Sequence, residues 1–426
     1  MRNRLVSVFI FIIYCISSQL TAQKQVNSPY GRFNLGILEP AGSFRGLGMG
    51  GTAVAMRDNN SVYFSNPASY SRVDTLSFIF DFGVDYSINF LSDNKSKYTS
   101  DDMNFDHLLF GFPVTNGFGI AAGIIPVSNG YYRIARDVKE GDPEYDPIAG
   151  AYSIYHSGTG GLTSCFIGTG IKIFKGFSAG ANLSILFGQI ERKTQYTFED
   201  YLKVFHNNTA EKLQISGINL NYGLQYSASF KNSLFINAGV AYTPGRYYKS
   251  NYEKITNLFS GYTTEDTISY IKSDTKAFLP GTVIAGISFG KLNKFVGEID
   301  YSTTQWSEGI IQGAEGYLAD RKGWNIGFEY IPDKFSNYSL IRRLEYRLGC
   351  RFERSYLIIN GEQVRETGIS AGLGLPMRRS LSKTNFFLDL TKRAGSAEKK
   401  MHSELYLTMG VSLNFYDFWF IKRKYE

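Results

Sequence analysis

Apolar and polar residues alternate along two long stretches of this chain. From Leu76 to Phe90 every even-numbered residue is apolar or aromatic, and Ser, Asp, Gly and Asn fill most positions between them. The same alternation, with apolar residues at odd positions, runs from Leu405 to Phe415. A repeat of two with one apolar face predicts a β-strand. Soluble strands average about 5–6 residues, so strands this long favour a membrane barrel over a soluble sandwich.

Similar segments recur along the chain, and we count about fourteen. The predicted strands span 75–92, 102–114, 117–128, 158–174, 177–198, 212–230, 233–247, 276–290, 294–306, 321–331, 342–354, 365–375, 384–393 and 402–416. An even number lets an antiparallel barrel close with both ends on one side, and closure leaves no unpaired edge in lipid. The predicted fold class is therefore all-β, a transmembrane antiparallel β-barrel of about 14 strands.

The connections between these strands alternate in length. Tight turns are predicted at 115–116, 175–176, 231–232 and 292–293, and long loops at 129–157, 199–211 and 248–275. Bacterial outer-membrane barrels have short periplasmic turns and longer outer loops. The alternation therefore places the N-terminus of the barrel in the periplasm.

Residues 1–22 have the pattern of a secretory signal peptide. Arg2 and Arg4 precede an apolar stretch from Leu5 to Ile16, and small residues lead to a predicted cleavage after Ala22. The apolar stretch is short for a bilayer span, although a retained anchor is the competing interpretation. We therefore expect export to the outer membrane.

Composition agrees with a barrel and argues against nucleic-acid binding. The chain has 30 Tyr and 33 Phe but a slightly negative mean hydropathy, as expected if every second strand residue is polar. The net charge is +7, yet Lys and Arg are scattered along the chain. Scattered charge favours contacts with anionic lipid head groups over a nucleic-acid surface, which needs a basic patch.

Candidate chemistry is sparse. The four histidines, His107, His156, His206 and His402, have no metal-ligand spacing with Cys, Asp or Glu, and no G-x-S-x-G motif occurs. We predict no enzyme, no metal and no cofactor, although a Ser/His pair formed between distant strands stays open. Cys165 and Cys350 fall in separate strands and are expected to be free, lipid-facing thiols.

Charged residues occupy the polar face of several predicted strands. They are Asp81 and Asp85, then Glu298 and Asp300, and finally Glu345, Arg347, Arg351 and Glu353. One interpretation is a structural ion-pair network that fills a wet lumen. The other is a polar relay or selectivity ring. The mixture of signs favours the network.

Residues 23–74 are rich in Gly, Asn and Ser, have weak periodicity, and are predicted to form a hatch inside the barrel. The glycines Gly46, Gly48, Gly50 and Gly51 superficially suggest a phosphate loop. No strand precedes them, and nucleotide cofactors are absent outside the cell. They are better explained by close backbone packing within a plug. A loose periplasmic tail is the alternative.

The hatch resembles that of the FadL outer-membrane transport family. The resemblance rests on the glycine-rich stretch from Gly46 and on Asn66, Pro67 and Ala68 just before the first strand, within residues 44–72. It implies a fourteen-stranded barrel with an internal hatch. It also implies passive uptake of fatty-acid-like or aromatic molecules, which leave sideways into the outer-membrane lipid.

The opening 28–33 and the ending 419–425 resemble Bacteroidetes-type members of this family. Some of these are similar to partners of the type IX secretion system, so a non-enzymatic barrel partner of such a system is the alternative function. The last strand is predicted to end on Phe415, which leaves a short basic tail at 417–426.

In the resembled family a kink in the third strand opens the barrel wall. Here that strand carries Gly123 and Pro126. Pro126 has no N–H for a ladder, and Gly123 permits a bend, so the pair is the candidate lateral gate. The alternative is that Pro126 simply marks the rim of the barrel.

Overall fold

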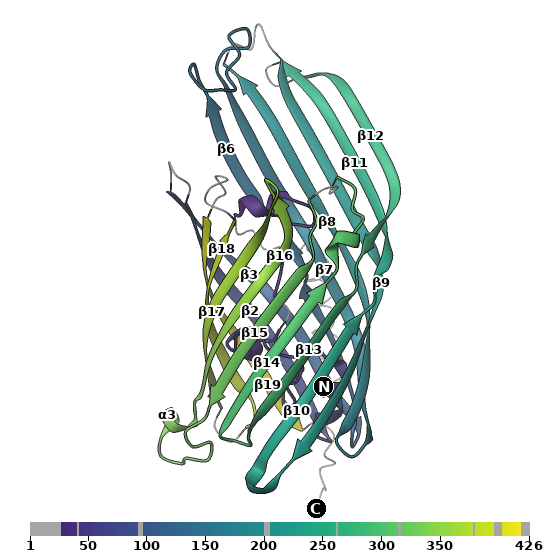
Figure 1. Cartoon of the computed structure of the whole chain (residues 1–426), viewed down its shortest axis with the longest axis vertical. Coiled ribbons are helices and arrows are strands. Elements are labelled where there is room, and N and C mark those ends of the chain that lie inside the picture. The colour runs from purple at the N-terminus through teal and green to yellow at the C-terminus, as the bar shows by residue number, and fades with distance from the viewer. Residues whose placement is uncertain are drawn as a thin grey trace, which may run out of the picture.

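The chain folds as a closed antiparallel barrel around its own N-terminal segment, as Figure 1 shows. The computed structural model describes residues 27–40, 42–92, 97–199, 205–260, 263–313, 317–377, 380–395 and 403–418. The predicted signal peptide and residues 419–426 lie outside these ranges.

Seventeen segments make up the barrel wall. They are β2 (Ser77–Ser92), β3 (Lys97–Thr115), β4 (Phe118–Pro126), β6 (Tyr132–Val138), β7 (Tyr152–Phe174), β8 (Phe177–Phe198), β9 (His206–Ser229), β10 (Leu234–Thr243), β11 (Arg246–Ser260), β12 (Thr263–Leu279), β13 (Thr282–Lys291), β14 (Phe295–Thr304), β15 (Arg321–Tyr330), β16 (Glu345–Ile359), β17 (Glu362–Pro376), β18 (Lys383–Ala394) and β19 (Ser403–Phe418). Three strands of the wall are each divided into two segments by one interruption. The divided strands are β4 followed by β6, β10 followed by β11, and β12 followed by β13. Seventeen segments minus three interruptions give the fourteen strands that the sequence predicted.

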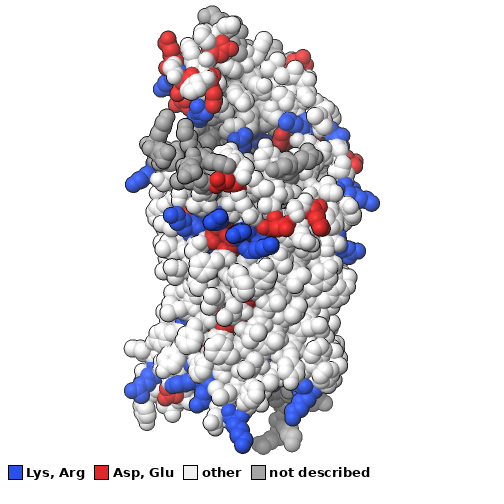
Figure 2. Space-filling model, in the orientation of Figure 1, with Lys and Arg blue, Asp and Glu red and all other residues white. Residues whose placement is uncertain are grey.

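Strands β19 and β2 pair along their whole length, from Phe418 opposite Ser77 to Ser403 opposite Ser92, and so close the wall. Inward residues of β2 such as Ile79 and Asp81 are buried, whereas the outward residues are exposed, as Phe82 is, or half-buried. Figure 2 shows the resulting uncharged band, bounded by Lys and Arg at the end with the short turns. None of the helices in the described ranges is long and apolar enough to cross a membrane.

The prediction of long outer loops is wrong in part, because much of 248–275 is strand. Segments β11 and β12 pair as a tall hairpin, and β6 lies within the predicted loop 129–157. Figure 1 shows β6, β11 and β12 rising beyond the shorter strands together with the outer parts of β7, β8 and β9. The outward side chains here, such as Lys249, Asn251 and Glu253, are polar. Because the outward face is polar, apolar and polar residues do not alternate here, and the sequence pattern did not predict these strands.

Short elements of the hatch lie inside the barrel. They are η1 (Pro29–Arg32), β1 (Ile37–Leu38), α2 (Phe44–Leu47) and η2 (Pro67–Arg72). The remaining short elements belong to connections: β5 (Ser128–Asn129), η3 (Lys231–Ser233), η4 (Trp306–Glu308) and α3 (Leu340–Arg343).

Four apolar clusters in the described residues include hatch side chains, and two of them are large. The first, here the upper cluster, includes Tyr30, Leu35, Leu162, Leu186, Ile190, Leu213, Ile215, Tyr248, Tyr252, Ala277, Trp306, Ile311, Tyr356, Leu357 and Val364. The second packs η2 and its flanks against β2, β3, β4 and β7, and includes Val62, Phe64, Tyr70, Val73, Ile79, Leu109, Ala121, Phe166 and Tyr416. Hatch residues contribute to both, so the plug and the wall share their core.

The outward position of Phe82 yields a test of the wall. Arg at this lipid-facing position should lower the free energy of unfolding by about 2–4 kcal/mol, because a guanidinium is costly near the middle of the bilayer. Phe82→Leu is the control and should lose less. Urea titration of barrels refolded into vesicles, followed by heat-modifiable gel mobility, measures both. Equal stability of the two variants would contradict the assignment.

Candidate functional site

The glycine-rich stretch of the hatch is packed against glycines of the wall. Gly50 and Gly51 have φ of +74° and +86°, which favours Gly at both positions. A Cβ on Gly48 would lie 3.1 Å from the Cα of Gly372, and one on Gly349 would lie 2.1 Å from the nitrogen of Gly50. The backbones therefore meet with no side chain between them.

Gly46 has a related but internal role. A Cβ there would lie 2.4 Å from the carbonyl oxygen of Thr52, and the N–H of Gly51 donates to the carbonyl of Gly46 at 2.8 Å. Gly50 N–H also donates to the hydroxyl of Ser370 on β17 at 2.8 Å. The four predicted glycines thus shape one compact turn and seat it on the wall.

The Asn66-Pro67-Ala68 motif begins η2, a few residues before β2. The Asn66 side chain caps this helix by accepting from Ala68 N–H at 3.1 Å, and its amide donates to the carbonyl of Val54 at 2.8 Å. Three wall glycines form the seat for this motif, namely Gly170, Gly180 and Gly223. A Cβ on any of them would come within 2.4 Å of Asn66 or Pro67 atoms.

The acidic pair on β14 holds the hatch through its backbone. Asp300 accepts from Ala53 N–H at 2.8 Å and from Val54 N–H at 3.1 Å. Glu298 accepts from Ala55 N–H at 2.8 Å. Both carboxyl groups are buried, so these bonds satisfy N–H groups that no strand pairs.

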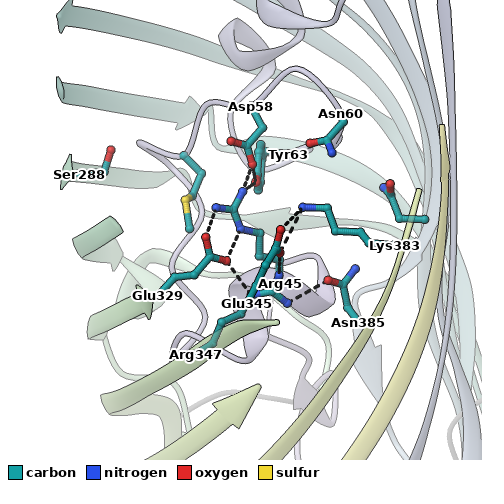
Figure 3. Close-up of polar contacts among 12 residues, drawn as sticks. Arg45, Asp58, Asn60, Tyr63, Ser288, Glu329, Glu345, Arg347, Lys383 and Asn385 are labelled. Carbon is teal, nitrogen blue, oxygen red and sulfur yellow. Dashed lines mark hydrogen bonds and ion pairs between the residues drawn. The ribbon is translucent and has the colours of Figure 1, made fainter. Parts of the chain in front are cut away.

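A buried ion-pair cluster joins the hatch to β15, β16 and β18 (Figure 3). Arg45 of the hatch binds Glu329 through two bonds, of 2.9 Å from Nε and 2.7 Å from Nη2. Glu329 also accepts from Arg347 Nε at 2.7 Å. Arg347 contacts Glu345, which accepts from Lys383 Nζ at 3.1 Å.

The remaining partners in Figure 3 complete the charge balance of this cluster. Tyr63 accepts from Arg45 at 2.6 Å and donates to Asp58 at 2.6 Å, while Arg347 donates to Asn385 at 2.9 Å. Arg45 also contacts Asp58. The three cations Arg45, Arg347 and Lys383 therefore face the three carboxylates Glu329, Glu345 and Asp58. Paired charges of this kind make the hatch attachment strong, because each partner would be left buried and uncompensated if the other moved away.

The other predicted lumen charges are spread over separate groups. Asp81 lies 3.3 Å from His107 Nε2, and Asp85 accepts from Ser87 at 3.0 Å. Arg351 donates to Thr391 at 2.8 Å and to Asp389 at 3.4 Å. The structure thus divides the predicted residues among several sites on the inner wall.

A cavity of about 160 Å³ lies between the hatch and the inner wall. Hatch residues from Ile37 to Pro40 and Ala53 line it, as do wall charges, which include Asp85, Arg321, Arg351, Glu353, Glu366, Asp389 and Arg393. The arginines here are paired, for example Arg321 with Glu353 at 2.6 Å. The lining therefore combines paired charges with apolar side chains such as Leu47, Ile284 and Phe387.

The interrupted third strand is the second part of the site. Gly123 lies in the paired region, opposite Leu109, and a Cβ there would lie 2.7 Å from Leu109 Cδ2. The ladder between β3 and β4 ends at Leu108 opposite Ile124, and Pro126 is the last residue of β4. Within the described ranges, no ladder pair joins residues 97–107 of β3 to β6.

Pro126 does not stand at the rim of the wall. Pro126 pairs with Thr163 in the middle of β7. The part of β7 from Tyr152 to Gly158 extends beyond this point and pairs with β6. Between Pro126 and β6 the chain turns inward, where β5 pairs with β1 of the hatch, Ile37 opposite Asn129 and Leu38 opposite Ser128. The interruption is therefore filled from inside by the hatch.

Asn27 extends this contact toward β2. Its side chain donates to the carbonyl of Arg133 at 3.1 Å and accepts from Arg133 N–H at 2.8 Å, as a paired strand would. Its own carbonyl accepts from Asn89 of β2 at 2.7 Å. Ser28 donates to Glu404 of β19 at 2.7 Å. These bonds hold the start of the hatch across the interrupted wall.

The structure shows no metal centre in the described residues, where no group of three or more His, Cys, Asp or Glu could hold an ion. Cys165 and Cys350 are free and alternate with the inward residues of β7 and β16. His402 lies outside the described residues.

Sequence reasoning missed Arg45, Glu329, Lys383 and Asn27. Glu329 is a polar residue at an inward position of the predicted strand 321–331, so alternation could have found it. Lys383 directly precedes the predicted strand 384–393 and was missed because that strand begins one residue earlier. The wall glycines at hatch contacts carried a second signal, because Gly inside a strand marks close backbone approach. Which of them meet the hatch depends on the fold.

The fold of this chain is similar to that of solved hydrocarbon and FadL-type channels. A structure of a Pseudomonas aeruginosa FadL homologue matches with a TM-score of 0.58 and 10% identity, over 90% of this chain and 99% of that chain. The Pseudomonas putida toluene transporter TodX matches with 0.56 and 12% identity, over 89% and 99%. The CymD monoaromatic hydrocarbon channel matches with 0.54 and 15%, over 90% and 99%.

At these identities the likeness concerns the fold. A search of curated proteins found no match. The family model described as BamG matches residues 3–426, which is nearly the whole chain.

The Arg45 cluster yields a prediction about the hatch. Arg45→Met should lower the free energy of unfolding by about 3–5 kcal/mol and raise ion conductance, since Glu329 loses a buried partner. The double variant Arg45→Met with Glu329→Gln should lose less free energy of unfolding than the two single variants lose together. Arg136→Ala is the control, because its pair with Glu144 is about half exposed and is worth about 1 kcal/mol or less. Additive losses at Arg45 and Glu329 would contradict the coupling.

Proposed function

The chain belongs to the BamG family, and we propose that it is a non-enzymatic outer-membrane channel for passive uptake of hydrophobic small molecules. In this proposal the hatch plugs the axial path and the solute leaves sideways into lipid. The observation that carries it is the interrupted third strand, where β3 and β6 share no ladder pair in the described residues.

The axial path is unfavourable for an apolar solute. Below the upper cluster, the hatch is bound to the wall by Arg45 and by the acidic pair Glu298 and Asp300. The cavity beside it is lined by paired charges, such as Arg321 with Glu353, as well as by apolar side chains. Opening this path would expose buried charges and backbone groups without partners, which costs several kcal/mol.

The lateral path begins in apolar surroundings. Val127, just after Pro126, packs against the upper cluster, as do Ile37 and Leu38 of β1. A hydrophobic solute that enters from the outer end meets this cluster before the charged lumen. The interruption lies next to it, so the apolar contact continues from the cluster to the wall and the lipid.

The fold of the related hydrocarbon channels and the FadL resemblance support this class of solute. Export by a cleaved signal peptide and placement in the outer membrane belong to the proposal. The resemblance to Bacteroidetes-type members rests partly on 419–425, which lie outside the described residues. A role as partner of a type IX-like secretion system stays the alternative prediction, and it would leave uptake of hydrophobic solutes at background.

A disulfide across β1 and β5 tests the lateral path. Leu38 and Ser128 are directly opposite in this antiparallel pair, so the double variant Leu38→Cys with Ser128→Cys should form a disulfide that locks the hatch against the interruption. Cells that carry the oxidised variant should lose uptake of labelled long-chain fatty acid and of labelled monoaromatic hydrocarbon. Reduction should restore it.

The single variant Leu38→Cys is the control and should respond to neither oxidant nor reductant. Transport by the oxidised double variant at the parent rate would exclude motion of the hatch at this point. Background uptake by the parent chain for both labels would reject the channel function itself.

A further inference from the structure

The loop between β15 and β16 exposes apolar side chains that lie outside the apolar clusters of the barrel. Phe335, Tyr338, Leu340 and Ile341 have exposed fractions of 74%, 101%, 48% and 69%. They fall within residues 331–344, which include α3. Single exposed apolar residues are common, but a group of four in one short loop marks a contact surface. We name residues 334–343 the foot.

The foot is held in place although its apolar side chains are free. Asp333 N–H donates to the carbonyl of Arg342 at 2.7 Å, which closes the loop. Lys334 donates to Asn293 in the neighbouring turn at 2.9 Å, and Lys294 donates to the carbonyl of Pro332 at 2.5 Å. The backbone is therefore fixed against the barrel, and the exposed side chains need no folding step before they meet a partner.

The foot lies beside the outer face of the wall, at the end with the short turns. Tyr346 alternates with the inward residues Glu345 and Arg347, so its side chain points outward, and its hydroxyl donates to the carbonyl of Ile341 at 3.0 Å. Tyr346 is directly opposite Tyr330, and Tyr330 is opposite Phe295. Figure 1 shows α3 projecting sideways from the barrel at this level.

Outward aromatic residues at the end of the apolar band mark the level of the lipid head groups. A loop that projects sideways just beyond them lies against the membrane surface and away from the mouth of the lumen. Arg342 and Arg343 add positive charge there and form no ion pair within the described residues. Figure 2 shows further Lys and Arg at the same end of the barrel.

We propose that the foot binds anionic phospholipid of the periplasmic leaflet. Phe335, Leu340 and Ile341 enter the boundary between head groups and acyl chains, and Arg342 and Arg343 bind the phosphates. Apolar residues beside a basic pair are the combination that interfacial segments use on anionic membranes. The site is independent of the hatch and of the proposed lateral path.

Tryptophan fluorescence in nanodiscs tests the position of the foot. Phe335→Trp should give a blue-shifted emission that brominated phospholipid quenches, after subtraction of the signal of the parent chain with its 3 Trp. Ile148→Trp is the control, because Ile148 is 86% exposed at the opposite end of the molecule. Its emission should resemble that of Trp in water. Water-like emission from Phe335→Trp, without quenching by brominated phospholipid, would overturn the proposal.

The charge preference needs a second measurement. Native mass spectrometry of the detergent-solubilised chain should show tighter binding of phosphatidylglycerol than of phosphatidylcholine. Arg342→Gln with Arg343→Gln should weaken phosphatidylglycerol binding about twenty-fivefold, since each charge near an anionic surface contributes about fivefold. Lys249→Gln with Lys276→Gln, a cross-strand pair of β11 and β12, is the matched control and should change little. Equal loss in both double variants, or no preference for anionic lipid, would overturn the proposal.

Discussion

In a bilayer every backbone N–H and C=O must find a partner within the protein, and the rest of this structure depends on that constraint. The wall meets it by closure, with β19 paired to β2 along sixteen residues. One place where the ladder between neighbouring strands stops inside the wall is the interruption after Pro126. There the hatch supplies the missing partners, through β1 opposite β5 and through the side chain of Asn27.

The same constraint explains why the hatch is fixed so firmly. Its chain runs through the lumen without long regular elements, so many of its N–H groups have no partner of their own. Side chains of the wall provide them, most clearly Asp300 and Glu298 at residues 53–55. Asp300 and Glu298 therefore act as acceptors for the plug, whereas Asp81, Glu353 and Asp389 pair with residues of the wall.

The hatch makes two kinds of contact with the wall, one apolar and one between charged groups. Near the outer end the hatch packs Tyr30 and Leu35 into an apolar cluster, whereas deeper in the lumen Arg45 lies among paired charges. The interruption of the wall lies at the level of the apolar cluster, next to Val127. The apolar cluster and the ion-pair cluster of Arg45 are therefore separate groups of contacts between the hatch and one barrel wall.

Sequence alone determined the class of fold, the number of strands and nearly all their positions in the wall. Alternation was sufficient for this, because lipid on one side and a polar lumen on the other impose opposite requirements on successive residues. It failed for β11 and β12, where water lies outside the wall and residues such as Lys249 and Glu253 remove the contrast. The hatch glycines and the Asn66 cap were also predictable, since their demands on the backbone are local.

Only the tertiary structure decided which charges meet and what fills the interrupted strand. Arg45 and Glu329 are 284 residues apart, and nothing near either residue in the sequence identifies its partner. The same holds for Asn27 and Arg133, and for Gly50 and Gly349. Likewise, Pro126 could have marked a rim or an interior break until the length of β7 beyond Thr163 was known. Local pattern fixes which way a side chain points, whereas the register and closure of the whole barrel fix what it meets.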